Sequence, residues 1–174
     1  MLKNCISATD REASIVSTLQ SSCYKNLCAD LLLDGKGLNG RLWIGAPWSG
    51  PGYCAATATS PGNNWFSLEL ALPHKISRVQ IIPRLDCFPG CKKFAQNIRI
   101  TIGISKFYYD PDEPLCLPEI PQLVMKEGFT DYICDPPQDK GKFVKISRKG
   151  DALNLCEVKI FTLTDDTTTA KVEL

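Results

Sequence analysis

The sequence is poor in the residues on which much enzyme and metal chemistry depends. Its 174 residues include one histidine and two methionines, and they contain no G-x-S-x-G, H-E-x-x-H or glycine-rich phosphate-binding motif. A histidine-based zinc site and a Ser-His-Asp triad are therefore not predicted. The one imidazole, His74, lies in Pro73-His74-Lys75, which is typical of a solvated turn between two strands. The sequence thus predicts a protein that is not an enzyme.

Two further absences narrow the class of protein. No run approaches the roughly 18–20 apolar residues that cross a bilayer, so no membrane span is expected. Lys and Arg number 20 and Asp and Glu 19, which gives a net charge of +1. Binding to nucleic acid needs a clear cationic excess, so we expect no nucleic-acid partner. With 44% hydrophobic residues, the chain can still form the core of one globular domain.

Cysteine is the residue in excess. Nine cysteines are typical of an oxidising compartment, where disulfides persist. The alternative is a cytosolic thiol protein with metal clusters, but the sequence has no pair of C-x2-C half-sites. The N-terminus also lacks the apolar segment of a signal peptide. We therefore expect a mature fragment or excised domain, with an added Met, of an extracellular protein that is secreted or is the ectodomain of a larger chain.

Most of the chain shows the alternation of half-buried strands. Short alternating segments are separated by Gly, Pro, Asn and Asp turns, and no amphipathic helix of about 12 residues or more is evident. The expected strands are 65–70, 76–82, 98–103, 143–147 and 156–161. This pattern predicts an all-β fold, an antiparallel β-sandwich or jelly roll. Residues 1–163 are expected to form a single domain, and residues 164–174 a polar tail or linker.

Three segments fit this pattern less well. Residues 10–16 are compatible with either a short helix or a strand. Residues 35–63 are rich in glycine and proline but also contain Trp43 and Trp48, which favours an ordered connection. Residues 108–122 carry four prolines, which disfavour pairing inside a sheet, so a loop is expected there.

Several segments, in order along residues 14–163, resemble one known pattern. The segments are Ser21-Ser22, 29–35, 64–70, 76–81, 84–87, 141–146 and 155–160. The first four resemble discoidin-like galactose-binding domains. Arg84-Leu85-Asp86-Cys87 is similar to the R-G-D-C of one branch, the F-type (fucose-binding) lectins, and the last two segments resemble that branch's GRYVSI and LCEVEV strands. The ordered set identifies the chain as an F-type lectin-like domain with a divergent sugar-binding motif.

The resemblance implies an eight-stranded antiparallel jelly roll whose ligand site lies in loops at one pole. The family binds fucose with a histidine and two basic residues in the pattern His…Arg-x-Asp-x4-Arg/Lys, which donate hydrogen bonds to the sugar. In this sequence Ala56 stands where the histidine would lie, two residues after Cys54. The four-residue spacer after Asp86 ends at Cys91, so the next lysines lie beyond it. The resemblance therefore implies a pocket that is altered.

Six residues are candidates for binding the ligand: Arg84, Asp86, Lys92, Lys93, Tyr53 and Trp48. Arg84 and Asp86 either pair only to order the loop, or act together with Asp86 orienting Arg84 toward a ligand. The two lysines are either solvated or contribute to binding. The two aromatic residues, which flank the glycine- and proline-rich loop, either pack that loop or stack on a sugar or a protein partner.

The resemblance also implies a Ca2+ ion between the loop that follows Asp34-Gly35 and the last strand. Hard oxygen ligands with one carboxylate suit this ion. The expected ligands are Lys36, Asn39, Ser49, Cys156 and Glu157. The aspartate that is usual in this loop is replaced by Leu38 or Asn39, which removes a charge. In the alternative interpretation, Glu157 is an ordinary polar residue of a strand.

Cysteine spacing alone leaves on the order of a hundred pairings open for eight of the nine cysteines. The resemblance implies two long-range bridges, Cys54–Cys156 and Cys116–Cys134. It also implies that Cys87–Cys91 replaces an adjacent Cys-Cys pair, and that Cys23–Cys28 is a local bridge. Cys5 is left over, either as a free thiol or as a contact with another chain.

Two functional hypotheses follow from the sequence. In the first, the chain is a secreted or cell-surface recognition module that binds a glycan or glycoprotein, fucose-like in kind, in an altered pocket. In the second, it is a protein–protein adhesion or assembly domain that has kept the lectin fold and lost sugar binding. A fold does not decide between them, because unrelated functions share folds.

Overall fold

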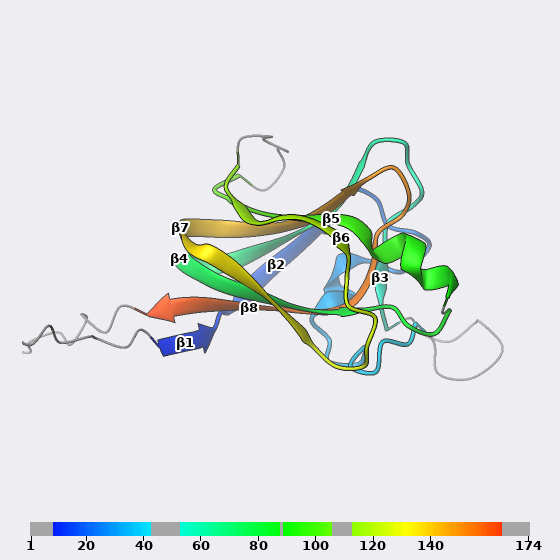
Figure 1. Cartoon of the computed structure of the whole chain (residues 1–174), viewed down its shortest axis with the longest axis horizontal. Helices are drawn as coiled ribbons and strands as arrows, with labels where there is room; N and C mark the ends of the chain where they lie inside the picture. Colours follow the sequence, from blue (N-terminus) through cyan, green and yellow to red (C-terminus); the bar gives the residue numbers. More distant parts are fainter. Residues whose placement is uncertain (1–8, 43–52, 88, 106–112, 165–174) are drawn as a thin grey trace, which may run out of the picture.

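The structure, a computed structural model, describes residues 9–42, 53–87, 89–105 and 113–164. Within these residues the chain forms antiparallel strands and two short 3-10 helices. In chain order they are β1 (Thr9–Glu12), β2 (Ile15–Gln20), η1 (Ala29–Leu32), β3 (Ala55–Ala56), β4 (Asn63–Pro83), η2 (Gly90–Ala95), β5 (Gln96–Gly103), β6 (Leu115–Gln122), β7 (Thr130–Lys149) and β8 (Asn154–Thr164). Pairing links them in the order β1-β8-β4-β7-β5-β6, with β2 beside β4 and β3 beside β8 (Figure 1).

Strands β4 and β7 are long enough to take part in two layers. The first half of β4 pairs with β2 on one side and with the second half of β7 on the other. The second half of β4, from Ile76 onward, pairs with β8 and with the first half of β7. Strands β5 and β6 extend the first layer, and β1 extends the second (Figure 1). Two sheets that share bent strands form a β-sandwich of the jelly-roll kind, so the predicted fold class is confirmed.

The bend in β4 lies where the register of its pairing with β7 shifts. The ladder is irregular between Glu69 and Ile76, and His74 lies opposite Gly141. A Cβ at Gly141 would collide with the side chains of Ile102 and Ile76, so the corner leaves no room for a larger residue. The turn expected at residues 73–75 is therefore wrong. This segment is a bulged corner inside one continuous strand, and bulges are places where a strand tolerates proline.

In two other segments the structure either decides between two predicted alternatives or departs from the prediction. Residues 10–16 contribute to strands β1 and β2 rather than to a helix. Within the proline-rich segment expected to be a loop, residues 115–122 form β6, which pairs with β5 at the edge of its sheet. At an edge, a proline can face away from the neighbouring strand without removing a ladder hydrogen bond, which explains why β6 forms despite its prolines.

The core lies between the two layers and follows the alternation of the sequence. Its buried members include Phe66, Leu68, Leu70, Ile98, Ile100, Ile102, Val144, Ile146, Val158 and Ile160. They come from four of the alternating segments that predicted strands. A second, smaller cluster of Leu27, Leu42, Cys54, Ala56, Ile82 and Cys156 lies at the end of the sandwich near β3 and the end of β4. This second cluster supports the candidate site.

The four predicted disulfides are all present: Cys23–Cys28, Cys54–Cys156, Cys87–Cys91 and Cys116–Cys134. The bridge between Cys54 and Cys156 joins residues 102 positions apart and ties β8 to the segment just before β3. Cys5, the cysteine expected to remain, lies outside the described residues.

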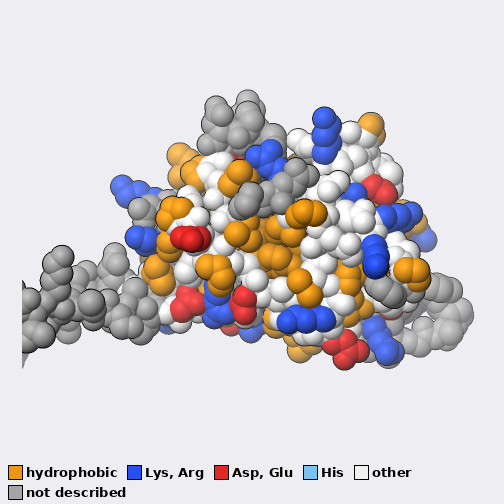
Figure 2. Space-filling model, viewed as in Figure 1, with side chains coloured by type: hydrophobic (Ala, Val, Ile, Leu, Met, Phe, Trp, Pro, Cys, Tyr) orange, Lys and Arg blue, Asp and Glu red, His pale blue; other side chains and the backbone are white. Residues whose placement is uncertain are grey.

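The surface carries both charge signs. Figure 2 shows hydrophobic side chains gathered in the middle of one face, with Lys, Arg, Asp and Glu side chains around them. Among the described residues, no helix has the length and apolar character required to cross a membrane.

Removing the long-range disulfide should destabilise the protein more than removing a local one. In the chain-entropy model, the 102-residue separation of Cys54–Cys156 corresponds to about 4–5 kcal/mol, and the five-residue separation of Cys23–Cys28 to about 2 kcal/mol. We expect denaturant unfolding to show a free energy about 2–3 kcal/mol lower for the Cys54→Ala/Cys156→Ala variant than for Cys23→Ala/Cys28→Ala. Equal losses in the two variants would contradict this prediction.

Candidate functional site

A cleft of about 470 Å3 opens at the end of the sandwich that carries β3, η2 and the end of β4. Its walls combine apolar residues (Leu27, Leu42, Ala56, Ala152), polar residues (Thr57, Thr59, Asn154), two aromatic residues (Tyr24, Phe94) and two cations (Lys25, Arg84). Among the described residues, no acidic side chain lines it. An apolar cleft with a few convergent polar groups is the usual form of a small-ligand site.

The floor of the cleft rests on the smaller hydrophobic cluster. Leu27, Leu42 and Ala56 belong both to that cluster and to the cleft wall, and the cluster also contains the buried Cys54–Cys156 disulfide. Ala56 therefore lies at the cleft, at the position where the family pattern places a histidine.

Arg84 enters the cleft directly after β4 and is held by two partners. Its Nε donates to Asp86 Oδ1 at 2.6 Å, and its Nη1 donates to Asn154 Oδ1 at 3.3 Å when the Asn154 amide nitrogen donates to Ala55 O. Asp86 is held in turn, because its Oδ2 accepts from Leu42 N at 3.0 Å. The remaining N–H groups of the guanidinium have no partner among the described residues. Asp86 thus pairs with Arg84 and fixes the direction of its guanidinium.

The opposite rim is a short turn closed by the Cys23–Cys28 disulfide. This turn presents Tyr24, which is 48% exposed, and Lys25, whose Nζ lies 5.4 Å from the centre of the Tyr24 ring. Tyr24 N donates to Ala56 O at 2.9 Å, which attaches the turn to the cleft floor. Lys25 has a φ of 54°, a left-handed conformation that non-glycine residues seldom adopt.

Phe94 of η2 and Ala152 form another wall, and Arg148 joins them from beneath. Arg148 Nη1 donates to the carbonyl oxygens of Lys93 and Ala152, the latter at 3.0 Å. The side chain is buried, burial lowers its pKa, and its Nε has no partner among the described residues. Sequence reasoning did not predict this role, because Arg148 lies on a strand and its two acceptors belong to separate segments.

Three other predicted ligand residues, Lys92, Lys93 and Tyr53, are described by the structure and are not on the cleft walls. Lys92 and Lys93 are exposed on η2, with Lys93 Nζ 4.8 Å from the centre of the Phe94 ring. Tyr53 is partly buried in the segment that precedes Cys54, and its N–H donates to Leu42 O at 2.9 Å. Trp48, like Trp43, lies outside the described residues.

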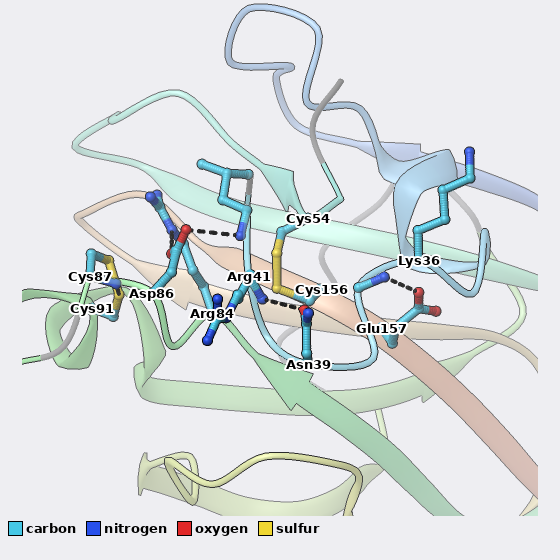
Figure 3. The surroundings of a disulfide bond; sticks show 12 residues. Lys36, Asn39, Arg41, Cys54, Arg84, Asp86, Cys87, Cys91, Cys156 and Glu157 are labelled. Atoms are coloured by element: carbon cyan, nitrogen blue, oxygen red, sulfur yellow. Dashed lines mark hydrogen bonds and ion pairs between the residues drawn. A yellow bond between two sulfur atoms is a disulfide. The ribbon is translucent and has the colours of Figure 1, made fainter. Parts of the chain in front are cut away.

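On the other side of the Cys54–Cys156 disulfide, the loop after η1 folds against Glu157 (Figure 3). Glu157 is 4% exposed, and its Oε1 accepts from Gly37 N at 2.9 Å. Burial, together with the nearby Asp34 carboxylate, raises the pKa of Glu157 to about 7. Glu157 is therefore a buried strand residue rather than a solvated one.

Gly37 lets the loop pass close to two main-chain carbonyl oxygens. A Cβ at Gly37 would collide with the carbonyl oxygens of Tyr53 and Cys156. The Lys36 amine points away from Glu157 (Figure 3). Asn39 Oδ1 accepts from Arg41 N at 3.1 Å. Carboxylate and carbonyl oxygens around a glycine are a donor set that suits a hard cation.

Of the expected metal ligands, four lie in this region, and Ser49 lies outside the described residues. Lys36, with its amine turned away, has only its main-chain oxygen to offer. Asp34, which was not among the expected ligands, adds a second carboxylate beside Glu157.

No protein-family model and no curated protein matches the chain. Solved structures do resemble it. A fucolectin from striped bass (Morone saxatilis) serum has a TM-score of 0.66 at 23% identity over 85% of this chain, which spans 45% of that protein. A fucose binding module of Streptococcus pneumoniae has a TM-score of 0.59 at 24% identity, over 85% of this chain and 94% of the module. An F5/8 type C domain from Bacteroides fragilis has a TM-score of 0.62 at 14% identity, over 87% and 97%.

These likenesses show that the chain has the fold of F-type lectins and discoidin-like domains, as the sequence motifs predicted. On the cleft walls, sequence reasoning identified Arg84 and missed Tyr24, Lys25, Phe94 and Asn154. One signal was available in hindsight, because Cys23 and Cys28 enclose a short segment that begins with an aromatic and a cation.

The hydrogen bonds from Arg148 to the carbonyls of Lys93 and Ala152 predict how a substitution of Arg148 would affect stability. Arg148→Met should leave the carbonyls of Lys93 and Ala152 without their donor, so the unfolding free energy should fall by about 1–3 kcal/mol. Amide hydrogen exchange should accelerate in residues 90–95 and 150–154 and remain unchanged in β1. Lys149→Met, a change at the exposed neighbouring residue, is the control. Unchanged exchange in both segments would show that Arg148 does not hold the cleft walls together.

Proposed function

We propose that this chain, which has the fold of F-type lectins, is an extracellular carbohydrate-recognition module that binds a glycan in the cleft around Arg84. The observation that carries the proposal is the state of Arg84. Its guanidinium is fixed by Asp86 and Asn154, yet it keeps N–H groups directed at an apolar cleft. A planar donor held in place can give two hydrogen bonds to vicinal sugar hydroxyls or to a carboxylate.

Three further features support binding rather than catalysis. The aromatic rings of Tyr24 and Phe94 flank the cleft and suit the apolar face of a sugar ring. The walls present no acid–base pair, since no carboxylate or imidazole lines the cleft among the described residues. The striped bass and pneumococcal proteins with this fold are a lectin and a fucose binding module.

The pocket proposed here differs from the family pattern in its chemistry. Ala56 supplies a methyl group where the pattern has an imidazole donor, and Phe94 rather than a basic side chain of η2 reaches the cleft wall. A site built to hydrogen-bond a given hydroxyl loses affinity when one partner is missing, because the other is left unpaired. The proposal is therefore a glycan ligand other than simple fucose.

The proposal includes a Ca2+ ion held by Glu157, Asp34, Asn39 and main-chain oxygens of the loop that contains Gly37. A bound cation would neutralise two neighbouring carboxylates and fix the loop. The four disulfides support the extracellular location, because such bridges persist outside the reducing cytosol.

Arg84 provides the test of the glycan site. Arg84→Ala should weaken binding of the best ligand on a glycan array by about 10–100-fold, as expected when donors to a polar ligand are removed. Arg11→Ala, on exposed β1 at the opposite end of the molecule, should leave affinity unchanged (Figure 1). Calorimetric titration of both variants, with their unfolding midpoints measured alongside, separates binding from stability. Binding to a protein that millimolar sugar does not displace would support the adhesion hypothesis instead.

The cation site has its own test. Millimolar Ca2+ should raise the melting temperature of the native protein by about 3–6 °C at ten times the dissociation constant. Glu157→Gln keeps an acceptor for Gly37 N but removes the charge, so this rise should disappear. Glu12→Gln, at an exposed carboxylate on β1, should retain it. A native protein with no rise would exclude the Ca2+ site and leave the glycan proposal intact.

A further inference from the structure

We infer that the cleft selects an acidic saccharide, one that carries a carboxylate or sulfate group, and that Lys25 is the residue that recognises this group. The inference deepens the glycan-binding proposal above and depends on it. It follows from the balance of charges and of hydrogen-bond donors and acceptors around the cleft.

The charge balance singles out Lys25. Two of the cations near the cleft have an acidic neighbour: Arg84 pairs with Asp86 at 2.6 Å, and Asp151 lies close enough to Arg148 to interact with its charge. Lys25 has no carboxylate partner among the described residues, where its amine lies 5.4 Å from the centre of the Tyr24 ring. Lys93, which lies on η2, also lacks a carboxylate partner within the described part of the chain. The cleft therefore has a positive rim that no acidic side chain of its walls offsets.

The hydrogen-bond balance points the same way. Two acceptors of the walls are used inside the protein: Ala56 O accepts from Tyr24 N and Thr57 Oγ1 accepts from Leu153 N, both at 2.9 Å. The Asn154 amide is engaged at both ends, with Ala55 O and Arg84. The donors of Arg84 and Lys25 remain.

A neutral sugar hydroxyl both donates and accepts, so it is matched best by a site that offers both kinds of group. An ionised carboxylate or sulfate only accepts, and it forms charge-assisted hydrogen bonds with lysine and arginine. A cleft with surplus donors and a surplus positive charge therefore matches a saccharide with such a group. Tyr24 and Phe94 remain available to the apolar face of its ring.

The turn that carries Lys25 is built to keep it at the rim. The Cys23–Cys28 disulfide closes the turn, and the Tyr24 N–H···O bond to Ala56 attaches it to the cleft floor. The disulfide and this hydrogen bond thus hold the main chain of the turn, and with it the position from which the Lys25 side chain extends.

The test compares neutral saccharides with their acidic counterparts on one array and in titrations: galactose with galacturonic acid, and galactose with galactose 6-sulfate. We expect the native protein to bind the acidic member of at least one pair about tenfold more tightly, with the preference shrinking at high salt. The two pairs distinguish a carboxylate from a sulfate.

Lys25→Gln should abolish the preference for the acidic member, because binding of that member should weaken by about tenfold more than binding of the neutral member. Lys126→Gln makes the same charge change at another exposed lysine and should preserve the preference. Equal affinity for both members of each pair, or a preference that survives in Lys25→Gln, would overturn the inference while the glycan-binding proposal stands. Failure to bind any saccharide, acidic or neutral, would overturn the glycan-binding proposal and this inference with it.

Discussion

The Cys54–Cys156 disulfide is the constraint on which both candidate sites depend. It joins the segment before β3 to β8 and is completely buried. On one side of it, Ala56 and Asn154 reach the cleft within two residues of the bridged cysteines. On the other side, Glu157 follows Cys156 directly and receives the loop of Gly37 (Figure 3). One disulfide thus fixes two surfaces of opposite chemical character. Residues next to its two cysteines contribute to the cleft on one side and to the Gly37 loop on the other.

The two surfaces differ in the groups that they present. The cleft is lined by N–H donors and aromatic rings, whereas the Gly37 loop gathers carboxylate and carbonyl oxygens. Each arrangement would be costly if it were left buried without a partner, because desolvated charges and unpaired polar groups destabilise a folded protein. The structure limits that cost in the same way at both sites. Main-chain or side-chain groups engage part of each charge: Asp86 and Asn154 at Arg84, and Gly37 N at Glu157.

The sequence was sufficient to predict what depends on local pattern. The alternation in segments such as 98–103 placed their isoleucines in the core, and the ordered motifs predicted the fold. Prediction from the sequence was wrong where the same local composition is compatible with either a turn or a strand. Pro73-His74-Lys75 has the composition of a turn, but pairing on both sides of this segment makes it a corner of β4. Prolines in 115–122 suggested a loop, but an edge position tolerates them. Of the cleft walls only Arg84 was predicted, because Lys25 and Phe94 come to lie beside it only after the long strands have folded.

The position of Ala56 explains how this fold can change its ligand without losing its stability. Ala56 packs in the smaller cluster against the disulfide, and its backbone pairs with Asn154 and bonds to Leu27. These contacts belong to the main chain and the methyl group, so a side chain that extends from Ala56 into the cleft is not needed to hold β3 in place. The core between the sheets is formed by other residues. In the proposed function, recognition passes from the β3 position to the Tyr24–Lys25 turn on another wall of the cleft, while the sandwich beneath remains the same.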